Sequence, residues 1–236
     1  MLPGNHFLDT LPDNVRRKLS FQLQPVHLPK RTQLSFEGEM VDTIYFPVSA
    51  VISKYQTTAE GHTIEVALAG REGAVGLAAA ASASEAISAS EVLLAGAVLK
   101  VGSANFNMIA ETEPQLSSAA VGLIDDETKR KTRRLICNRY HNVEQRFCTW
   151  LLTLADRSGK TKLRVTQEEI ARALGVHRPT VTDASQILRA HGMIGHPQGV
   201  VNILDPDKLE SAACECREAL RVVSRQSAIT QASPAF

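Results

Sequence analysis

The sequence predicts a mixed α+β protein, in which an antiparallel β-barrel or jelly roll is followed by a long helix and a small helical domain. Three observations predict this arrangement. The first half holds short β-forming runs with turn signals about every 8–12 residues. The middle is a charge-rich stretch without internal proline, and the rear half holds two short helical patterns joined at a glycine.

The composition is that of an ordinary globular protein. The 236 residues are 44% hydrophobic and 22% charged, which excludes dominant disorder and fits one large domain or two modest ones. No apolar run approaches the ~20 residues that a membrane helix needs, and residues 1–10 lack the pattern of a signal peptide. We therefore expect a cytoplasmic protein with no membrane partner, whose four cysteines are reduced thiols.

The net charge of +1 conceals an uneven distribution. Residues 1–112 carry 8 Lys/Arg against 11 Asp/Glu, whereas residues 113–139 carry 6 against 4 and residues 140–236 carry 12 against 10. An acidic front and a mildly basic rear favour two domains with different partners, although chance asymmetry explains the numbers equally well.

The first half is predicted to hold a short opening helix over residues 13–21 and then a series of strands. Residues 58–61 end in Gly61, which reaches a positive φ easily, so the runs on either side are expected to form a hairpin. Residues 62–66 alternate polar and apolar side chains, which is typical of a half-buried strand. The predicted strands are residues 25–29, 33–36, 43–48, 50–57, 62–68, 91–94 and 97–101.

Residues 114–137 predict one long helix, because they contain no internal proline and only one glycine. Residues 125–134 within it are dense in charge. Its apolar side chains share a narrow face in the first half, namely Leu116, Ala120, Leu123 and Ile124. So narrow a stripe favours a connector between domains or a dimer seam, and a solvated helix packed on its own domain is the alternative.

A second helix is predicted over residues 143–156. Asn142 is its N-cap, and Gln145, three residues further on, completes a capping box. Trp150 and the leucines beside it supply the buried face, and Gly159 ends the helix.

Residues 166–190 hold the most specific motif in the chain. Two helices that cross at ~90–120° through a short turn need a small residue at the contact, a flexible residue at the bend and an apolar anchor on the second helix. Ala171, Gly175 and Val181 stand at those three positions. The spacing predicts a helix-turn-helix; a plain helical hairpin is the alternative.

The flanking residues agree with this prediction. Thr166 can cap the first helix, and the second begins at His177 or Arg178 with Pro179 in its first turn. Residues 192–204 then predict two short strands around a turn, which together form a wing beside the second helix.

The outer face of the second helix carries side chains that suit DNA. Arginine can bond both acceptors of guanine, and threonine can contact a thymine methyl group or a phosphate. Free amides at a helix N-terminus bind phosphate. The predicted base readers are Arg178, Thr180, Thr182 and Asp183, and the other predicted DNA-binding residues are Thr166, Gln167, His177, Arg189, His196 and Gln198.

A β-rich front half, a long central helix and a winged helix-turn-helix together resemble the Crp/Fnr family of transcription regulators. The resemblance spans about residues 5–225 and is most specific over residues 166–204, while residues 137–152 and 213–216 resemble one branch of the family. It implies a homodimer on a palindromic operator in double-stranded DNA, with RNA polymerase as a further partner. The domains it implies are a cyclic-nucleotide-binding-like jelly-roll sensor (1–112), a dimerisation helix (113–140) and a winged helix-turn-helix domain (141–225). Residues 226–236 are small and polar and are expected to form a flexible tail.

The chain departs from the family's phosphate cassette, which uses Gly-Glu for the ribose and Arg-Ser or Arg-Thr for the cyclic phosphate. In the matching stretch Gly76 is followed by Leu77, and Ser88 is preceded by Ile87. A phosphate without a cationic partner in an apolar pocket is poorly stabilised. We therefore expect an effector pocket at these four residues that does not bind cyclic AMP; a cyclic mono- or dinucleotide held by an altered cassette is the alternative.

The resemblance also implies an altered operator. Arg178 matches the family pattern, but Pro179 and Asp183 replace an acidic and a basic base reader. A carboxylate accepts hydrogen bonds only from the amino groups of cytosine or adenine, so the recognised sequence should differ.

No pattern for catalysis or a cofactor is found. The histidines show neither HExxH nor a paired HxH, and no phosphate-binding or GxSxG loop occurs. An enzyme built on a metal-dependent barrel is therefore a weak alternative. A second weak alternative is an interaction protein that no longer binds DNA. Cys214 and Cys216 are placed in a last helix, where residues two apart face different ways and do not share a metal. Cys137 and Cys148 are expected to be ordinary buried cysteines, with a redox sensor as the alternative.

Overall fold

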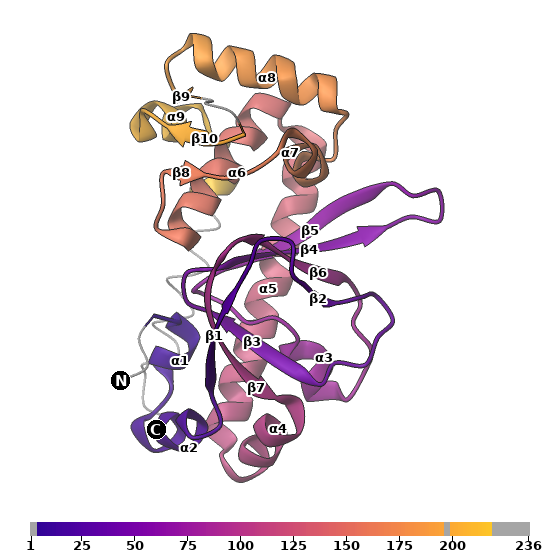
Figure 1. The fold of residues 1–236 in the computed structure, drawn as a ribbon, viewed down its shortest axis with the longest axis vertical. Helices are drawn as coiled ribbons and strands as arrows, with labels where there is room; N and C mark the ends of the chain where they lie inside the picture. The colour runs from indigo at the N-terminus through magenta and orange to yellow at the C-terminus, as the bar shows by residue number, and fades with distance from the viewer. Residues whose placement is uncertain (1–3, 196–198, 219–236) are drawn as a thin grey trace.

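The computed structural model describes residues 4–195 and 199–218, and its parts follow the predicted order (Figure 1). A β-rich N-terminal part is followed by the long helix α5, which runs along the length of the molecule to a cap of C-terminal helices. The predicted turn of the wing and the predicted tail lie outside the described residues. Within the described residues, no helix is long and apolar enough to cross a membrane.

The N-terminal part is an antiparallel roll of two sheets, which confirms the predicted fold class. One sheet has the strand order β1-β7-β3 and the other has the order β2-β6-β4-β5. Each predicted strand is present within two residues of its expected ends. The strands are β1 (Gln24–Leu28), β2 (Gln33–Ser35), β3 (Thr43–Pro47), β4 (Val51–Thr57), β5 (Thr63–Ala69), β6 (Ala89–Leu94) and β7 (Gly96–Gly102).

Short helices cover the roll, and only α2 (Asp13–Ser20) was expected from the sequence. The others are α1 (His6–Thr10), α3 (Leu77–Ser82) and α4 (Ser103–Thr112). They were missed because α1 and α3 are too short to show a period and α4 mixes polar and apolar residues. These helices pack with Phe46 of β3 in one hydrophobic core. The Phe46 ring stacks on Phe7, with ring centroids 5.8 Å apart, and lies beside Phe106.

The helix α5 (Pro114–Tyr140) is three residues longer than predicted, because its hydrogen bonding continues to the bond from the His141 amide to the Cys137 carbonyl (3.2 Å). Its first half buries Leu116 and Ala120 against the helices of the roll. The helix also carries exposed apolar residues, namely Val121, Leu135, Ile136 and Tyr140.

The C-terminal part consists of helices with a three-stranded wing sheet. The helices are α6 (Val143–Ser158), α7 (Gln167–Leu174), α8 (Arg178–Ala190) and α9 (Pro206–Ala212), and the strands are β8 (Lys162–Leu163), β9 (Ile194–Gly195) and β10 (Val201–Ile203). The capping box of Asn142 and Gln145 and the left-handed C-cap Gly159 delimit α6 as predicted. β9 and β10 pair as the predicted wing, and β8, which was not predicted, adds to the outer edge of β10.

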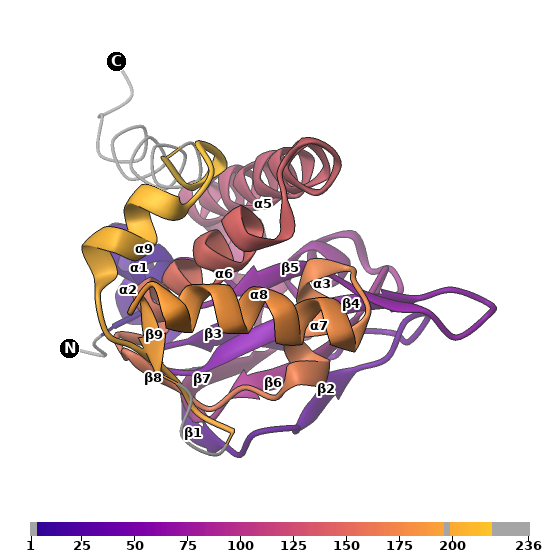
Figure 2. The same ribbon diagram turned by 90° about the horizontal axis from the view of Figure 1, so that it is seen from above.

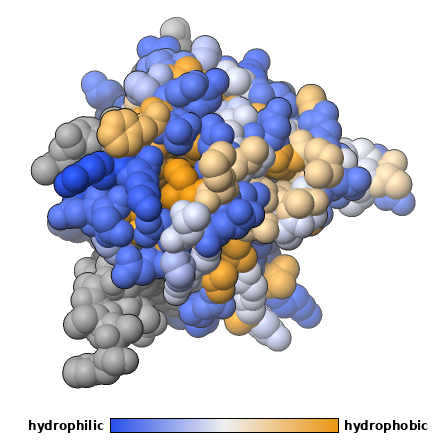
Figure 3. All heavy atoms as spheres, turned by 90° about the horizontal axis from the view of Figure 1, so that it is seen from below, coloured by the Kyte–Doolittle hydropathy of each residue, from blue (hydrophilic) through white to orange (hydrophobic). Residues whose placement is uncertain are grey.

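The two parts share one hydrophobic core. Leu68 and Leu93 of the roll pack in the same cluster as Trp150 of α6 and the buried faces of α7 and α8. The end of the roll farthest from α8 is instead mainly hydrophilic with separated apolar patches (Figure 3).

Candidate nucleic-acid interface

The turn between α7 and α8 has the geometry of a helix-turn-helix. Gly175 adopts a left-handed conformation (φ 61°), and its amide and that of Val176 both donate to the Ala171 carbonyl. Ala171 is 7% exposed at the contact, and Val181 is fully buried as the anchor of α8. The three residues that predicted the motif therefore have the predicted roles.

The N-termini of both helices begin as predicted. Thr166 accepts a hydrogen bond from the Glu169 amide (3.2 Å), while the Glu169 carboxylate accepts one from the Thr166 amide (2.8 Å). His177 is the N-cap of α8 and Pro179 lies in its first turn. The Thr166 hydroxyl is occupied as the cap of α7. Any contact of Thr166 with a DNA phosphate would therefore be made at the start of that helix.

The helix α8 lies at the outer end of the molecule (Figures 1 and 2), and side chains along one face of it are exposed. Arg178, Asp183 and Arg189 are exposed, and Thr180 and Thr182 are half-buried. Arg178 Nε donates to Gln167 Oε1 (3.3 Å), which brings these two predicted DNA contacts together. The remaining predicted contacts are His177, which is exposed beside Arg178, and His196 and Gln198, which lie outside the described residues.

Two arginines hold the C-terminal end of α7. Arg134 of α5 donates to the Ala173 carbonyl, and Arg146 of α6 donates to the Leu174 carbonyl (2.8 Å). Cations stabilise the carbonyl end of a helix, so these contacts fix the orientation of the helix-turn-helix. No local pattern predicts them, because the partners are 39 and 28 residues apart.

The same Arg134 reaches a buried carboxylate of the roll. Glu65 of β5 is 2% exposed and pairs with Arg134 (3.0 Å). Its other bonds come from the Trp150 indole (3.0 Å) and the Ser53 hydroxyl (2.8 Å). One carboxylate therefore joins the sheet, the long helix and the first helix of the C-terminal part.

Further polar contacts seat α7 on the roll. Arg172 pairs with Glu91 of β6 (3.3 Å) and lies over the Tyr55 ring, 4.7 Å from its centroid. Lys30 pairs with Glu169 at the start of α7 (2.8 Å). The helix-turn-helix is thus tied to the roll at its first helix, while α8 remains open.

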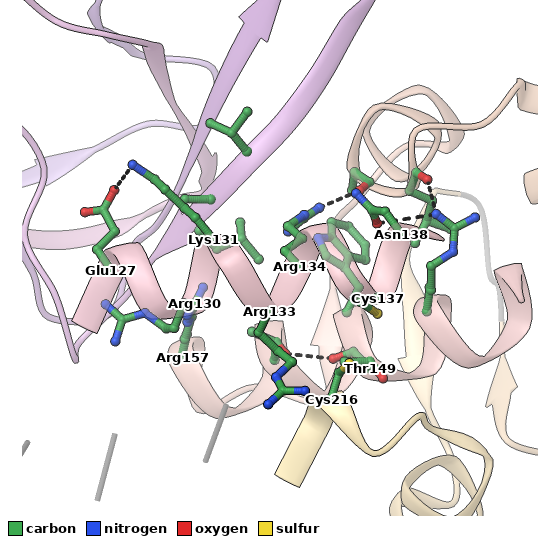
Figure 4. A pocket seen from close by; sticks show the side chains of 18 residues that line it. Glu127, Arg130, Lys131, Arg133, Arg134, Cys137, Asn138, Thr149, Arg157 and Cys216 are labelled. Atoms are coloured by element: carbon green, nitrogen blue, oxygen red, sulfur yellow. Dashed lines mark hydrogen bonds and ion pairs between the residues drawn. The ribbon is translucent and has the colours of Figure 1, made fainter. Parts of the chain in front are cut away.

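A cavity of about 80 Å³ lies between β5, α5 and α6, and basic side chains surround it (Figure 4). It is lined by the charged stretch of α5, including Arg130, Lys131 and Arg133, and by Arg157 of α6. Lys131 pairs with Glu127 (2.8 Å), so part of this charge is neutralised within the molecule.

Glu127 of α5 is held as a carboxylate by two lysines. Burial raises its pKa, but Lys54 of β4 and Lys131 outweigh burial and lower the pKa of Glu127 to about 2. Burial also lowers the pKa of Lys54 against the pull of Glu127, which offsets part of the gain.

Glu127→Gln is therefore expected to lower the free energy of unfolding by about 2 kcal/mol at pH 7. Because the folded pKa lies below the ordinary value of 4.5, the difference should be complete above that pH and decrease as the pH falls towards about 2. Urea unfolding of the protein and the variant at pH 7 and pH 3 measures it. An equal difference at both pH values would show that the charge is not its source.

The four residues of the expected effector pocket occupy different environments. Gly76 is the left-handed N-cap of α3, and a Cβ there would lie 2.7 Å from the Thr43 carbonyl oxygen. Leu77 is buried in the core, whereas Ile87 is 68% exposed and Ser88 is buried. None of these four side chains can supply a cation for a phosphate.

The residues just before the cassette point to the C-terminal part. Arg71 Nε donates to the Arg157 carbonyl (3.3 Å), and Glu72 pairs with the Arg157 guanidinium (2.8 Å). Both are thus engaged at the end of α6 and do not replace the missing phosphate ligands.

The predicted placement of Cys214 and Cys216 together in one last helix was wrong. The helix α9 ends at Ala212, and the C-cap Ala213 is extended (φ −73°, ψ 160°), so the two cysteines do not lie on opposite faces of that helix. They lie beside Cys137, with Cys214 Sγ 3.5 Å from Cys137 Sγ. Cys148 is buried elsewhere, and burial raises the pKa of its thiol to about 12, which disfavours a reactive thiolate.

Comparisons with known proteins agree with this geometry. The model of the Crp-like helix-turn-helix domain matches residues 145–212, from α6 to α9. FixK2 from Bradyrhizobium japonicum has a TM-score of 0.70 at 17% identity, covering 81% of this chain and 98% of that one. A transcriptional regulator of the CRP/FNR family from Thermus thermophilus has a TM-score of 0.66 at 21% identity, covering 80% and 98%.

A third similar structure is the c-di-GMP responsive global regulator CLP of Xanthomonas campestris. It has a TM-score of 0.67 at 16% identity, covering 82% of this chain and all (100%) of that chain. A search of curated protein sequences gives no match.

The chain shares with these solved structures a β-roll, a long helix and a helix-turn-helix. Similarity at these identities establishes the fold, and the matched domain establishes the type of DNA reader. The chain contains a Crp-like helix-turn-helix domain, and its fold is similar to that of a solved regulator of the CRP/FNR family.

Proposed function

We propose that the chain is a homodimeric, sequence-specific DNA-binding regulator in which each subunit inserts α8 into the major groove. The observation that carries the proposal is the exposed polar face of α8, with Arg178 exposed at its first turn. Two such helices would read half-sites ~34 Å apart in a palindromic operator. The division into a sensor (1–112), a dimerisation helix (113–140) and a DNA-binding domain (141–225) is part of the proposal.

The predicted contacts divide into two groups. Arg178, Thr180, Thr182 and Asp183 would read bases from the first two turns of α8. Thr166 and Gln167 at the start of α7, together with His177, Arg189 and the wing residues His196 and Gln198, would position the DNA backbone. Arg189 is 11 residues beyond Arg178, hence ~16 Å further along the helix, which suits a separate backbone contact.

Fluorescence anisotropy on DNA from the region upstream of the chain's own gene tests the proposal. We expect a preference of ~1,000-fold or more over scrambled DNA, and an affinity that falls steeply with salt. Equal binding to both DNAs at every salt concentration would contradict it.

The dimer would form through α5. Val121, Thr128 and Leu135 recur every seven residues along it, and Val121 and Leu135 are 66% and 71% exposed. A heptad of apolar and small residues is typical of a helix that pairs with a second copy.

Leu135→Glu is expected to weaken the dimer by about 30-fold or more, because it places two like charges across the seam. Sedimentation equilibrium measures the dissociation constant. Met108→Glu on α4, where Met108 is 61% exposed, is the matched control and should leave the dimer unchanged. Equal dissociation constants for the protein and Leu135→Glu would exclude this seam.

The effector of the sensor is proposed to be something other than cyclic AMP, because Leu77 and Ile87 occupy the positions that would hold ribose and phosphate. A second candidate is a cyclic dinucleotide bound through an altered cassette, which the similarity to the c-di-GMP responsive regulator favours. Calorimetry with cyclic AMP and cyclic di-GMP separates the two. Binding would change the affinity for DNA through α5 by ~1–3 kcal/mol.

The proposal assigns the chain no catalytic activity. As a DNA-binding regulator it would act in the cytoplasm and contact RNA polymerase at the operator. Genome-wide mapping of its DNA sites together with polymerase occupancy tests the contact with RNA polymerase.

A further inference from the structure

Four potential metal ligands converge at the corner between α5 and α6. Cys137 and His141 lie one turn apart at the end of α5, and Cys214 and Cys216 follow α9. The three thiol sulfurs and an imidazole nitrogen all lie within 4.8 Å of one another. Cys137 and Cys216 also line one end of the cavity in Figure 4.

The spacing of these atoms fits a single tetrahedral ion. A Zn–S bond of about 2.3 Å places two sulfurs of a tetrahedron about 3.8 Å apart. Cys137 Sγ and Cys214 Sγ are 3.5 Å apart, and Cys216 Sγ is 3.7 Å from His141 Nδ1. These two separations differ from the tetrahedral ones by only a few tenths of an ångström.

The surroundings orient the ligands as metal sites do. The Nδ1 atom of His141 faces Cys216, and its Nε2 atom lies 2.9 Å from the Glu215 carboxylate. A carboxylate on the far nitrogen is the usual support of a metal-binding imidazole. Thr149 of α6 lies 3.2 Å from Cys214 Sγ and accepts a hydrogen bond from the Cys214 amide (3.3 Å).

Ordinary packing does not account for this cluster. Cys137, Cys214 and Cys216 are 7%, 3% and 1% exposed and form a buried group separate from the larger hydrophobic cores. A disulfide between Cys137 and Cys214 would leave Cys216 and His141 facing each other without a role. The remaining cysteine, Cys148, is buried among apolar side chains and serves as an internal comparison.

We propose that Cys137, His141, Cys214 and Cys216 bind one Zn²⁺ ion in a closed structural site. Three thiolates and one imidazole are a Zn²⁺ ligand set, and four protein ligands leave no position open for catalysis. The ion joins the end of α5 to the segment after α9, which is 77 residues further along the chain. It thereby fixes the C-terminal helices on the long helix, through which, under the proposed function, a signal from the sensor would pass.

Metal analysis of the full-length chain tests the proposal. The protein is purified under reducing conditions with Zn²⁺ in the medium and then dialysed, and about one Zn²⁺ per chain is expected. Replacing Zn²⁺ by Co²⁺ should give the intense visible absorption of a tetrahedral site together with sulfur-to-cobalt charge transfer. A chain without Zn²⁺, weak octahedral Co²⁺ absorption, or a Cys137–Cys214 disulfide in the purified protein would each overturn it.

Matched variants localise the ion. Cys216→Ala should lose the bound Zn²⁺, whereas Cys148→Ala, which removes a buried thiol outside the cluster, should keep one per chain. Because a ligand variant can fail to fold, Glu215→Gln provides a second measurement that retains all four ligands. It should weaken Zn²⁺ binding by about tenfold in competition with a chromophoric chelator. Retention of Zn²⁺ by Cys216→Ala would contradict the assignment. So would an equal affinity for Zn²⁺ in Glu215→Gln and in the unmodified protein.

The test is independent of the proposed function. Zn²⁺ content and Co²⁺ absorption do not depend on an operator or an effector. Failure to bind DNA therefore leaves the site standing, and absence of Zn²⁺ leaves the helix-turn-helix standing.

Discussion

Glu65→Ala is expected to lower the free energy of unfolding by about 3–5 kcal/mol, since it removes the buried carboxylate that balances the charge of the Arg134 guanidinium. The lost bonds from Trp150 and Ser53 add to the effect, because both donors are buried with the carboxylate. Chemical unfolding, followed by circular dichroism, measures the change.

Two further variants show which part of the interaction matters. Glu65→Gln retains an acceptor for Trp150 but removes the charge opposite Arg134, so its destabilisation should be intermediate. Glu60→Ala alters a carboxylate that is 84% exposed in the turn just before β5 and should change stability by less than about 0.5 kcal/mol. If Glu65→Ala and Glu60→Ala were equally stable, the buried carboxylate would not hold the two parts together.

The consequence for DNA binding follows from Arg134. The Arg134 guanidinium bonds both Glu65 and the carbonyl end of α7. If the loss of Glu65 displaces this guanidinium, the helix-turn-helix should also be held less firmly. We therefore expect Glu65→Ala to weaken operator binding even at temperatures where the chain remains folded.

The elements of the fold were predictable because their signals are local. The strands of the roll show alternation and turn residues, and the caps Asn142, Thr166 and Gly175 each act within four residues of their partners. The helix α3 escaped prediction because six residues rich in alanine carry no period.

The connections between the parts were not predictable, because they join residues far apart in the sequence. Glu65 and Trp150 are 85 residues apart, and Cys137 and Cys214 are 77 residues apart. The pattern Cys-x-Cys was visible, but assigning it to a helix hid its geometry, since the chain is already extended at Ala213 and both thiols reach Cys137. Only the folded chain brings these pairs together.

Arg178→Glu is expected to weaken binding to the preferred operator by about 100-fold and to leave thermal stability unchanged. Arg178 is exposed at the first turn of α8, where the proposed bidentate contact with guanine would contribute ~1–3 kcal/mol of discrimination. The carboxylate adds repulsion from the phosphates to this loss. Anisotropy titrations on the operator and on scrambled DNA measure the two affinities.

A variant of Arg189 serves as the comparison that distinguishes base reading from general attraction to the DNA phosphates. Arg189→Ala should weaken both DNAs equally and reduce the salt dependence by about one ion, because a backbone contact carries no sequence information. Arg178→Lys should retain attraction to the phosphates but reduce discrimination, since an ammonium group lacks the rigid planar fork that makes two parallel bonds. Arg178 is the base reader only if its variants change the preference between the two DNAs; a uniform loss would instead assign it to the backbone and move the reading to Thr180, Thr182 and Asp183.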